Sequence, residues 1–138
     1  MSIVAHKKIK GDSKESLLKA VEQAMQLANW KEYVKGKKVF IKTNLLLKKV
    51  VPGLCTSPWV LEGIIKVLKK NNKEILFGDC NVATTKQVEE AAENWGIQDL
   101  CKKYNNNFLN LSKQPTTRIN EKGKILKYIE VPEILTKA

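Results

Sequence analysis

The chain has few cysteines and no long apolar run. Its three cysteines, Cys55, Cys80 and Cys101, are odd in number and lie at least 21 residues apart. This spacing excludes a disulfide framework and a zinc knuckle of the C-x-x-C type, and it favours free thiols. No apolar stretch approaches the roughly 20 residues that cross a bilayer, and the first ten residues are too polar for a signal peptide. We therefore expect a cytoplasmic protein with no membrane partner.

Arginine and histidine are nearly absent. Among 25 basic residues only Arg118 is an arginine, and His6 is the single histidine. The net charge is +11, and residues 1–50 hold twelve lysines against four acidic residues. The ammonium group of lysine is a hydrated point charge. It lacks the planar guanidinium group with which arginine forms specific paired hydrogen bonds to phosphates and bases. The pattern favours a solvated lysine-rich surface, and it leaves polyanion binding and small anionic ligands open.

The common signatures of catalysis are also missing. The sequence has no G-x-S-x-G elbow, no Walker loop and no dinucleotide G-x-G-x-x-G motif, and its glycines are isolated. Catalytic residues therefore stay unknown. With 138 residues, 43% of them hydrophobic and 28% charged, the chain has the size and composition of one globular domain over residues 1–138.

Apolar periodicity predicts helices and strands that alternate along the chain. A helix–strand–helix–strand order with short, apolar strands is typical of parallel strands joined by a right-handed crossover. We expect a three-layer α/β fold, with a mostly parallel sheet, helices on both faces and a C-terminal β-hairpin. The expected helices span residues 13–29, 58–70, 86–95 and 97–104, the strands span 37–44, 74–80 and 108–111, and the hairpin strands span 116–119 and 124–131. Thr84 and Thr85 are expected to cap the third of these helices.

Polar residues gather where the predicted strands end. Ligands of open parallel sheets bind outside the carboxyl ends of the strands, beside helix N-termini. A crossover helix that begins near Thr56 and Ser57 starts at this same edge. We therefore predict a phosphate or carboxylate pocket here, formed by Lys42, Asn44, Thr56, Ser57, Asp79, Cys80 and Asn81. Asp79 is expected to orient Lys42 or to hold a metal-bound anion, and not to touch the anion directly, because like charges repel.

A plainer interpretation of the same residues stays open. Serine, threonine, asparagine and aspartate dominate helix caps and turns even where no ligand binds. Cys55 and Cys80 fall beside this edge, and a helix N-terminus stabilises a thiolate, so the sequence leaves their reactivity undecided. Cys101 lies on an apolar helix face and is expected in the core.

Residues 45–55 form an unusually apolar connection. Six large apolar residues surround Lys48 and Lys49, which is too many for a solvated loop. We expect this loop to be disordered, to fold over the pocket as a lid, or to be buried against another copy of the chain in a homo-oligomer.

Several of these segments resemble a family of uncharacterised proteins, domain of unknown function family 362. The likeness rests on residues 39–44 (VFIKTN), 52–58 (PGLCTSP) and 75–80 (ILFGDC). Residues 108–111 and 129–132 also look like the family, and the resemblance covers residues 1–138 in order. This chain departs from the family pattern at Thr43, Ser57 and Cys80, where proline, threonine and serine are usual.

The resemblance implies an N-terminal piece of a larger protein, or a shortened relative, and a missing C-terminal half as one candidate partner for residues 45–55. Many relatives carry cysteine-rich segments that bind iron–sulfur clusters, which implies a redox link in full-length relatives and no such cofactor in this chain. Two functions stay open: a ligand-binding or catalytic domain that uses the strand-end pocket, and a lysine-rich polyanion module that uses residues 1–50. Nucleic acid is the less favoured ligand because lysine alone reads no sequence.

Overall fold

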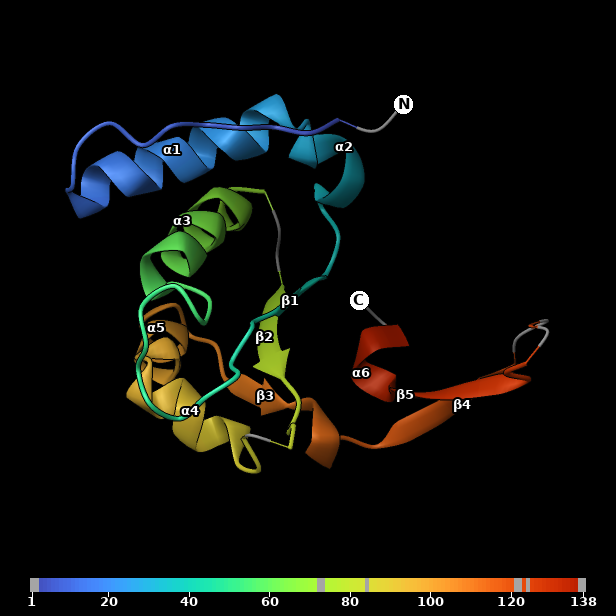
Figure 1. Cartoon of the computed structure of the whole chain (residues 1–138). Coiled ribbons are helices and arrows are strands. Elements are labelled where there is room, and N and C mark those ends of the chain that lie inside the picture. Colours follow the sequence, from blue (N-terminus) through green and yellow to red (C-terminus); the bar gives the residue numbers. More distant parts are fainter. Residues whose placement is uncertain (1–2, 72–73, 84, 121–122, 124, 137–138) are drawn as a thin grey trace.

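The computed structural model describes residues 3–71, 74–83, 85–120, 123 and 125–136, and it forms an α/β fold (Figure 1). The helices are α1 (Lys14–Leu27), α2 (Trp30–Val34), α3 (Pro58–Lys69), α4 (Val88–Asn94), α5 (Ile97–Lys103) and α6 (Glu133–Thr136), with a 3-10 turn η1 (Leu111–Lys113). The strands are β1 (Val39–Lys42), β2 (Ile75–Asp79), β3 (Phe108–Asn110), β4 (Thr116–Asn120) and β5 (Tyr128–Pro132). No helix within the described ranges combines the length and apolar character that crossing a membrane requires.

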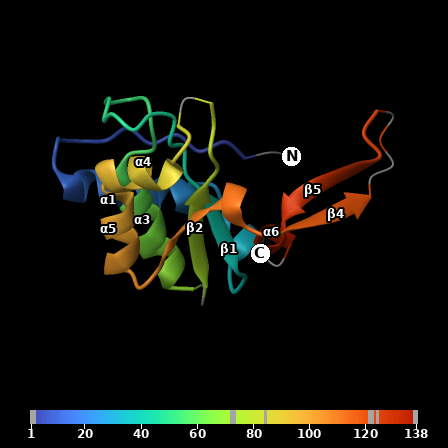
Figure 2. The same cartoon turned by 90° about the horizontal axis from the view of Figure 1, so that it is seen from below.

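The central sheet is parallel throughout and has the order β1-β2-β3. Ile41 pairs with Phe77, and Phe77 pairs with Phe108. Helices α3, α4 and α5 gather on one side of this sheet, while α6 and the hairpin lie on its other side (Figures 1 and 2). The predicted fold, a parallel sheet flanked by helices with a C-terminal β-hairpin, is confirmed.

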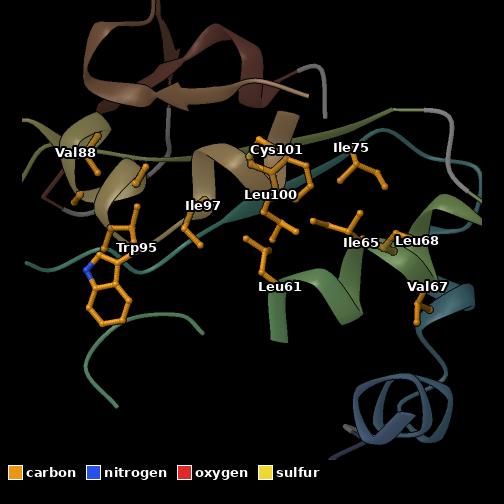
Figure 3. Close-up of a cluster of buried hydrophobic side chains, with 14 of the residues drawn as sticks. Leu61, Ile65, Val67, Leu68, Ile75, Val88, Trp95, Ile97, Leu100 and Cys101 are labelled. Atoms are coloured by element: carbon orange, nitrogen blue, oxygen red, sulfur yellow. The ribbon is translucent and has the colours of Figure 1, made fainter. Parts of the chain in front are cut away.

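The core lies between the sheet and these three helices. Fully buried side chains of α3, α4 and α5 meet Phe77 and Ile75 of β2, and Cys101 lies among them (Figure 3). Hydrophobic burial of this kind supplies the main favourable term in folding. Burial also raises the pKa of the Cys101 thiol to about 11, because desolvation disfavours the thiolate.

Helix α1 packs mainly on α3. Its predicted start is confirmed, because Ser13 is the N-cap and accepts a 3.1 Å hydrogen bond from the Ser16 amide. The two helices approach closely at Gly63, where an added Cβ would lie 2.9 Å from Cβ of Val21. A glycine on α3 therefore permits this helix contact.

A buried carboxylate ties α1, α3 and α5 together. Glu62 on α3 accepts hydrogen bonds from Lys103 at 2.8 Å and from the Tyr104 hydroxyl at 3.0 Å, and it pairs with Lys14 at 2.5 Å. Burial alone raises the pKa of Glu62, but the bonds from Lys103, Lys14 and Tyr104 outweigh it and lower the pKa to about 2. Burial and the bond to Glu62 raise the pKa of Tyr104 to about 12.

The second strand carries a glycine where the sheet leaves no room for a side chain. A Cβ at Gly78 would lie 2.3 Å from the Leu109 carbonyl oxygen and 3.0 Å from Cζ of Phe40. Real Cβ atoms do not approach backbone oxygen so closely. Gly78 therefore allows β2 to run beside β3 and to end in Asp79.

The C-terminal hairpin differs from its prediction at one end. Strand β5 begins at Tyr128 and not near residue 124, and Ile125 lies outside it with a 90% exposed side chain. Residues 121, 122 and 124 fall outside the described ranges. Alternation of apolar residues in 125–131 predicted a longer strand, but among the described residues the pairing covers 128–132, in register with 116–120.

Candidate functional site

The predicted site lies where β1 and β2 end. The two strands are parallel neighbours, and Lys42 at the end of β1 is in register with Gly78 next to the end of β2. The polar residues that follow both strands therefore emerge at the same edge of the sheet, as the sequence predicted.

Lys42 and Asp79 form the central contact of this edge. The Lys42 ammonium donates to Oδ1 of Asp79 at 2.6 Å and to the Thr43 carbonyl at 3.2 Å. The Lys42 side chain is 56% exposed, while that of Asp79 is 5% exposed. Asp79 therefore holds the Lys42 ammonium, and the anion beside this pair stays a prediction.

Backbone amides complete the surroundings of the Asp79 carboxylate. The Leu45 amide donates to Oδ2 at 2.8 Å and the Cys80 amide donates to Oδ1 at 2.9 Å. Buried carboxylates need such donors, because an unpartnered buried charge is costly. Asp79 is consequently held in place by three donors, and it holds the Lys42 side chain in turn.

Asn44 and Thr56 join the end of β1 to the start of α3. The Asn44 amide donates to Oγ1 of Thr56 at 2.9 Å, and the Thr56 amide donates to the Asn44 carbonyl at 3.0 Å. The Asn44 side chain also donates to the Leu54 carbonyl at 3.2 Å. These bonds close residues 44–56 into a loop and bring the helix start to the strand end.

Ser57 is the N-cap of α3, and Pro58 occupies the first helical position. The Ser57 side chain makes no capping hydrogen bond and is exposed. In a helix the first amides lack partners within the helix, so those of Trp59 and Val60 point outward as donors. The 12 residues of α3 add a positive dipole end at this place.

Asn81, which follows β2, forms hydrogen bonds that stabilise the fold. Its side-chain oxygen accepts from the Val88 amide at 3.2 Å and from the Asn110 side chain at 3.0 Å, and its amide donates to the Ser112 hydroxyl at 2.9 Å. The N-cap residue of α4 is Gln87, which makes no side-chain capping bond, and Asn81 accepts the bond from the first amide of the helix instead. The prediction that Thr84 and Thr85 cap this helix is wrong for Thr85, which donates to the Leu46 carbonyl instead, and Thr84 lies outside the described ranges.

The sequence analysis did not assign two further residues, Thr43 and Asn110, to this edge of the sheet. Thr43 is buried and its hydroxyl donates to the Gly78 carbonyl at 3.3 Å. Asn110 is buried at the end of β3. Asn110 could have been predicted from the sequence, because it is a polar residue at the end of β3, just as Asp79 is at the end of β2.

The first part of the loop of residues 45–55 packs against the rest of the same domain. Leu45 is buried, and the next three carbonyls accept hydrogen bonds from Thr85, from the Trp95 indole at 2.9 Å, and from Asn94 at 3.2 Å. Lys48 also pairs with Glu90. Residues 45–48 are ordered against their own domain, so the expectation of disorder is wrong for this part of the loop. The lid and the second copy of the chain stay predictions, and Leu46, Val50 and Val51 are exposed.

Within the described ranges, the cysteines and acidic residues do not assemble a metal centre. Cys55 and Cys80 are half-buried free thiols. Across the ranges that the structure describes, no three His, Cys, Asp or Glu side chains gather closely enough to hold a metal ion. An iron–sulfur cluster needs about four cysteine ligands, and the three cysteines of this chain do not fit that requirement.

The fold and this edge define an α/β domain whose strand ends carry a fixed lysine–aspartate pair beside a helix N-terminus. The chain belongs to the family described as Domain of unknown function (DUF362), whose model matches residues 39–138. The matched range includes the whole of the edge and leaves α1 outside. No curated protein and no solved structure shows significant similarity to the chain.

Proposed function

We propose that this domain binds a small anion, a phosphate or a carboxylate, at the carboxyl edge of its parallel sheet. The observation that carries the proposal is the half-exposed Lys42 ammonium, which Asp79 holds at 2.6 Å. Because the side chain is already fixed, binding an anion would cost little further conformational entropy.

The hydrogen bonds of the Lys42 ammonium leave one of its N–H donors for an anion. An ammonium group has three donors, and Lys42 uses two of them, toward Asp79 and Thr43. The third is available on the exposed side. Asp79 neutralises much of the lysine charge, so attraction for an anion must come partly from other groups.

The start of α3 supplies those groups in the proposal. Asn44 and Thr56 hold this start next to the end of β1. The Ser57 hydroxyl, two backbone amides and the helix dipole all favour negative charge. We assign Lys42 and Ser57 to direct contact with the anion, with Asn44 and Thr56 positioning the helix.

The remaining predicted site residues take supporting roles. Asp79 orients Lys42, and Asn81 holds the start of α4. Cys80 contributes its amide to Asp79, and its thiol has no assigned part. The proposal is therefore one of binding, and it assigns no catalytic step.

Titration calorimetry with inorganic phosphate and with acetate tests this proposal. Lys42→Gln and Ser57→Ala should each weaken binding several-fold and together by about tenfold, a loss typical of charge-assisted hydrogen bonds. Lys49→Gln is the matched control, because Lys49 is exposed and forms no ion pair with a described residue. Full affinity in the double variant, or equal loss in the control, would show that the anion binds elsewhere.

A further inference from the structure

A second feature of the molecule lies between the N-terminal segment and α1. The extended segment before α1 runs back along that helix (Figure 1). Between them lies a cavity of about 340 Å³, lined by Lys7, Lys8, Lys10, Ser16, Lys19, Ala20 and Gln23. The residues that line the cavity all come before residue 39, so they lie outside the part of the chain that matches the family.

The lining of this cavity carries charge of one sign. Four lysines and no acidic residue surround it. None of these four forms an ion pair with a described residue, whereas nine other lysines each form one. Glu22, an acidic residue of the same helix, pairs with Lys70 instead. Four like charges around one hollow repel one another, and a multivalent anion would relieve that repulsion.

The α1 wall of the cavity adds polar groups. Ser16, Lys19, Ala20 and Gln23 follow the spacing of one helix face. Ser16 lies in the first turn of α1, where the helix dipole is positive. The small Ala20 side chain leaves room between the polar ones.

We propose that this cavity binds a compact oligophosphate, a chain of two or three phosphates either free or as part of a small molecule. Four ammonium groups match the charge of such a group, and lysine binds phosphate as a point charge without directional preference. The volume lies in the range of small-ligand sites and exceeds what one phosphate fills. This site is separate from the strand-end site of the proposed function.

Calorimetric titration with inorganic tripolyphosphate tests the inference. The variant Lys8→Gln/Lys19→Gln removes one charge from each wall, and Lys49→Gln/Lys86→Gln removes two exposed charges outside the cavity. We expect the first variant to weaken binding by about tenfold and the second by about twofold or less at roughly 50 mM salt. The same two comparisons in the Lys42→Gln/Ser57→Ala background, in which the strand-end site is disabled, should give the same losses, which separates this site from the strand-end site.

Four outcomes would overturn the inference. One is equal loss in the two double variants, which indicates diffuse attraction by the basic surface. Another is the absence of measurable tripolyphosphate binding to the wild type. A third is affinity for single phosphate as high as that for tripolyphosphate in the Lys42→Gln/Ser57→Ala variant, in which the strand-end site is disabled. The last is duplex DNA that binds and is not displaced by tripolyphosphate. Circular dichroism and thermal unfolding of each variant verify that the fold is intact.

Discussion

Lys42 donates a 2.6 Å hydrogen bond to Asp79, and this bond joins the ends of two neighbouring parallel strands. The carboxylate is buried and also accepts from the amides of Leu45 and Cys80. One aspartate therefore fixes a lysine side chain and the first turns of two loops. Stability and ligand binding should depend on these two residues in different ways.

Replacement of Asp79 should cost much more stability than replacement of Lys42. Asp79→Ala leaves two backbone amides without their partner in a buried place, and we expect a loss of about 3 kcal/mol. Lys42→Gln removes a half-exposed partner and should cost about 1 kcal/mol. Urea unfolding of both variants measures the difference. Similar losses in the two variants would contradict the role given to Asp79.

Gly78 should tolerate no side chain. An alanine Cβ would meet the Leu109 carbonyl oxygen at 2.3 Å, so β2 and β3 would have to separate, at a cost of about 3 kcal/mol. Gly36→Ala is the control, since nothing lies within 4 Å of its added Cβ and only its positive φ of 76° is unfavourable, which should cost about 1 kcal/mol. If the two variants unfold at the same urea concentration, the close strand contact is not real.

The buried Glu62 should make stability depend on pH at the acid end. Its pKa is lowered from 4.5 to about 2, so its contribution is complete above pH 4.5 and is lost as the pH falls toward 2. We expect Glu62→Gln to lose about 2–3 kcal/mol at neutral pH and to approach the wild type near the lower pKa. Glu74→Gln removes a half-exposed carboxylate paired with Lys38 and should cost about 0.5 kcal/mol or less. A constant difference between wild type and Glu62→Gln at every pH would contradict the assignment.

The three thiols should fall into two classes. Cys101 is buried and burial raises its pKa to about 11, whereas Cys55 and Cys80 are half-buried. A thiol reagent at mildly alkaline pH should therefore modify Cys55 and Cys80 in the folded protein, and Cys101 only after unfolding. Mass spectrometry of the modified peptides locates the label. Labelling of Cys101 at the same rate as the others would mean that the core opens readily.

Self-association through the loop of residues 45–55 is a separate prediction. Leu46, Val50 and Val51 are exposed on a loop whose first residues are fixed to the domain, and an ordered apolar patch favours an interface. We expect the wild type to form a dimer that Leu46→Asp or Val50→Asp dissociates, as measured by sedimentation. Leu126→Asp is the control, because Leu126 is 63% exposed on a different part of the chain. A wild type that sediments as a monomer at every concentration excludes this interface.

Much of the fold was predictable because local patterns and packing agree. The Ser13 cap, the proline at the first position of α3 and the apolar run of β2 each specify their element from nearby residues. The start of α4 was not predictable in this way. The acceptor for its first amide is Asn81, which lies seven residues earlier in the chain than Val88. A threonine nearer to the helix matched the usual cap pattern equally well.

The sequence predicted which residues gather at the ends of β1 and β2. It did not predict most of the hydrogen bonds between them. Parallel topology alone brings Lys42 and Asp79 to one edge, and opposite charge then makes them pair. The exchange of hydrogen bonds between Asn44 and Thr56 depends on how an 11-residue loop closes, which no local pattern specifies. The lysine cavity was equally hidden, because composition shows the excess of lysine but not the fold of residues 7–10 against α1.

A crystal structure of the protein with inorganic phosphate tests the central claim most directly. We expect a phosphate within hydrogen-bond distance of the Lys42 ammonium and of the Ser57 hydroxyl or the first free amides of α3, with Asp79 still bonded to Lys42. The account is contradicted if the crystals hold phosphate elsewhere while this edge is empty, or if protein atoms close the start of α3.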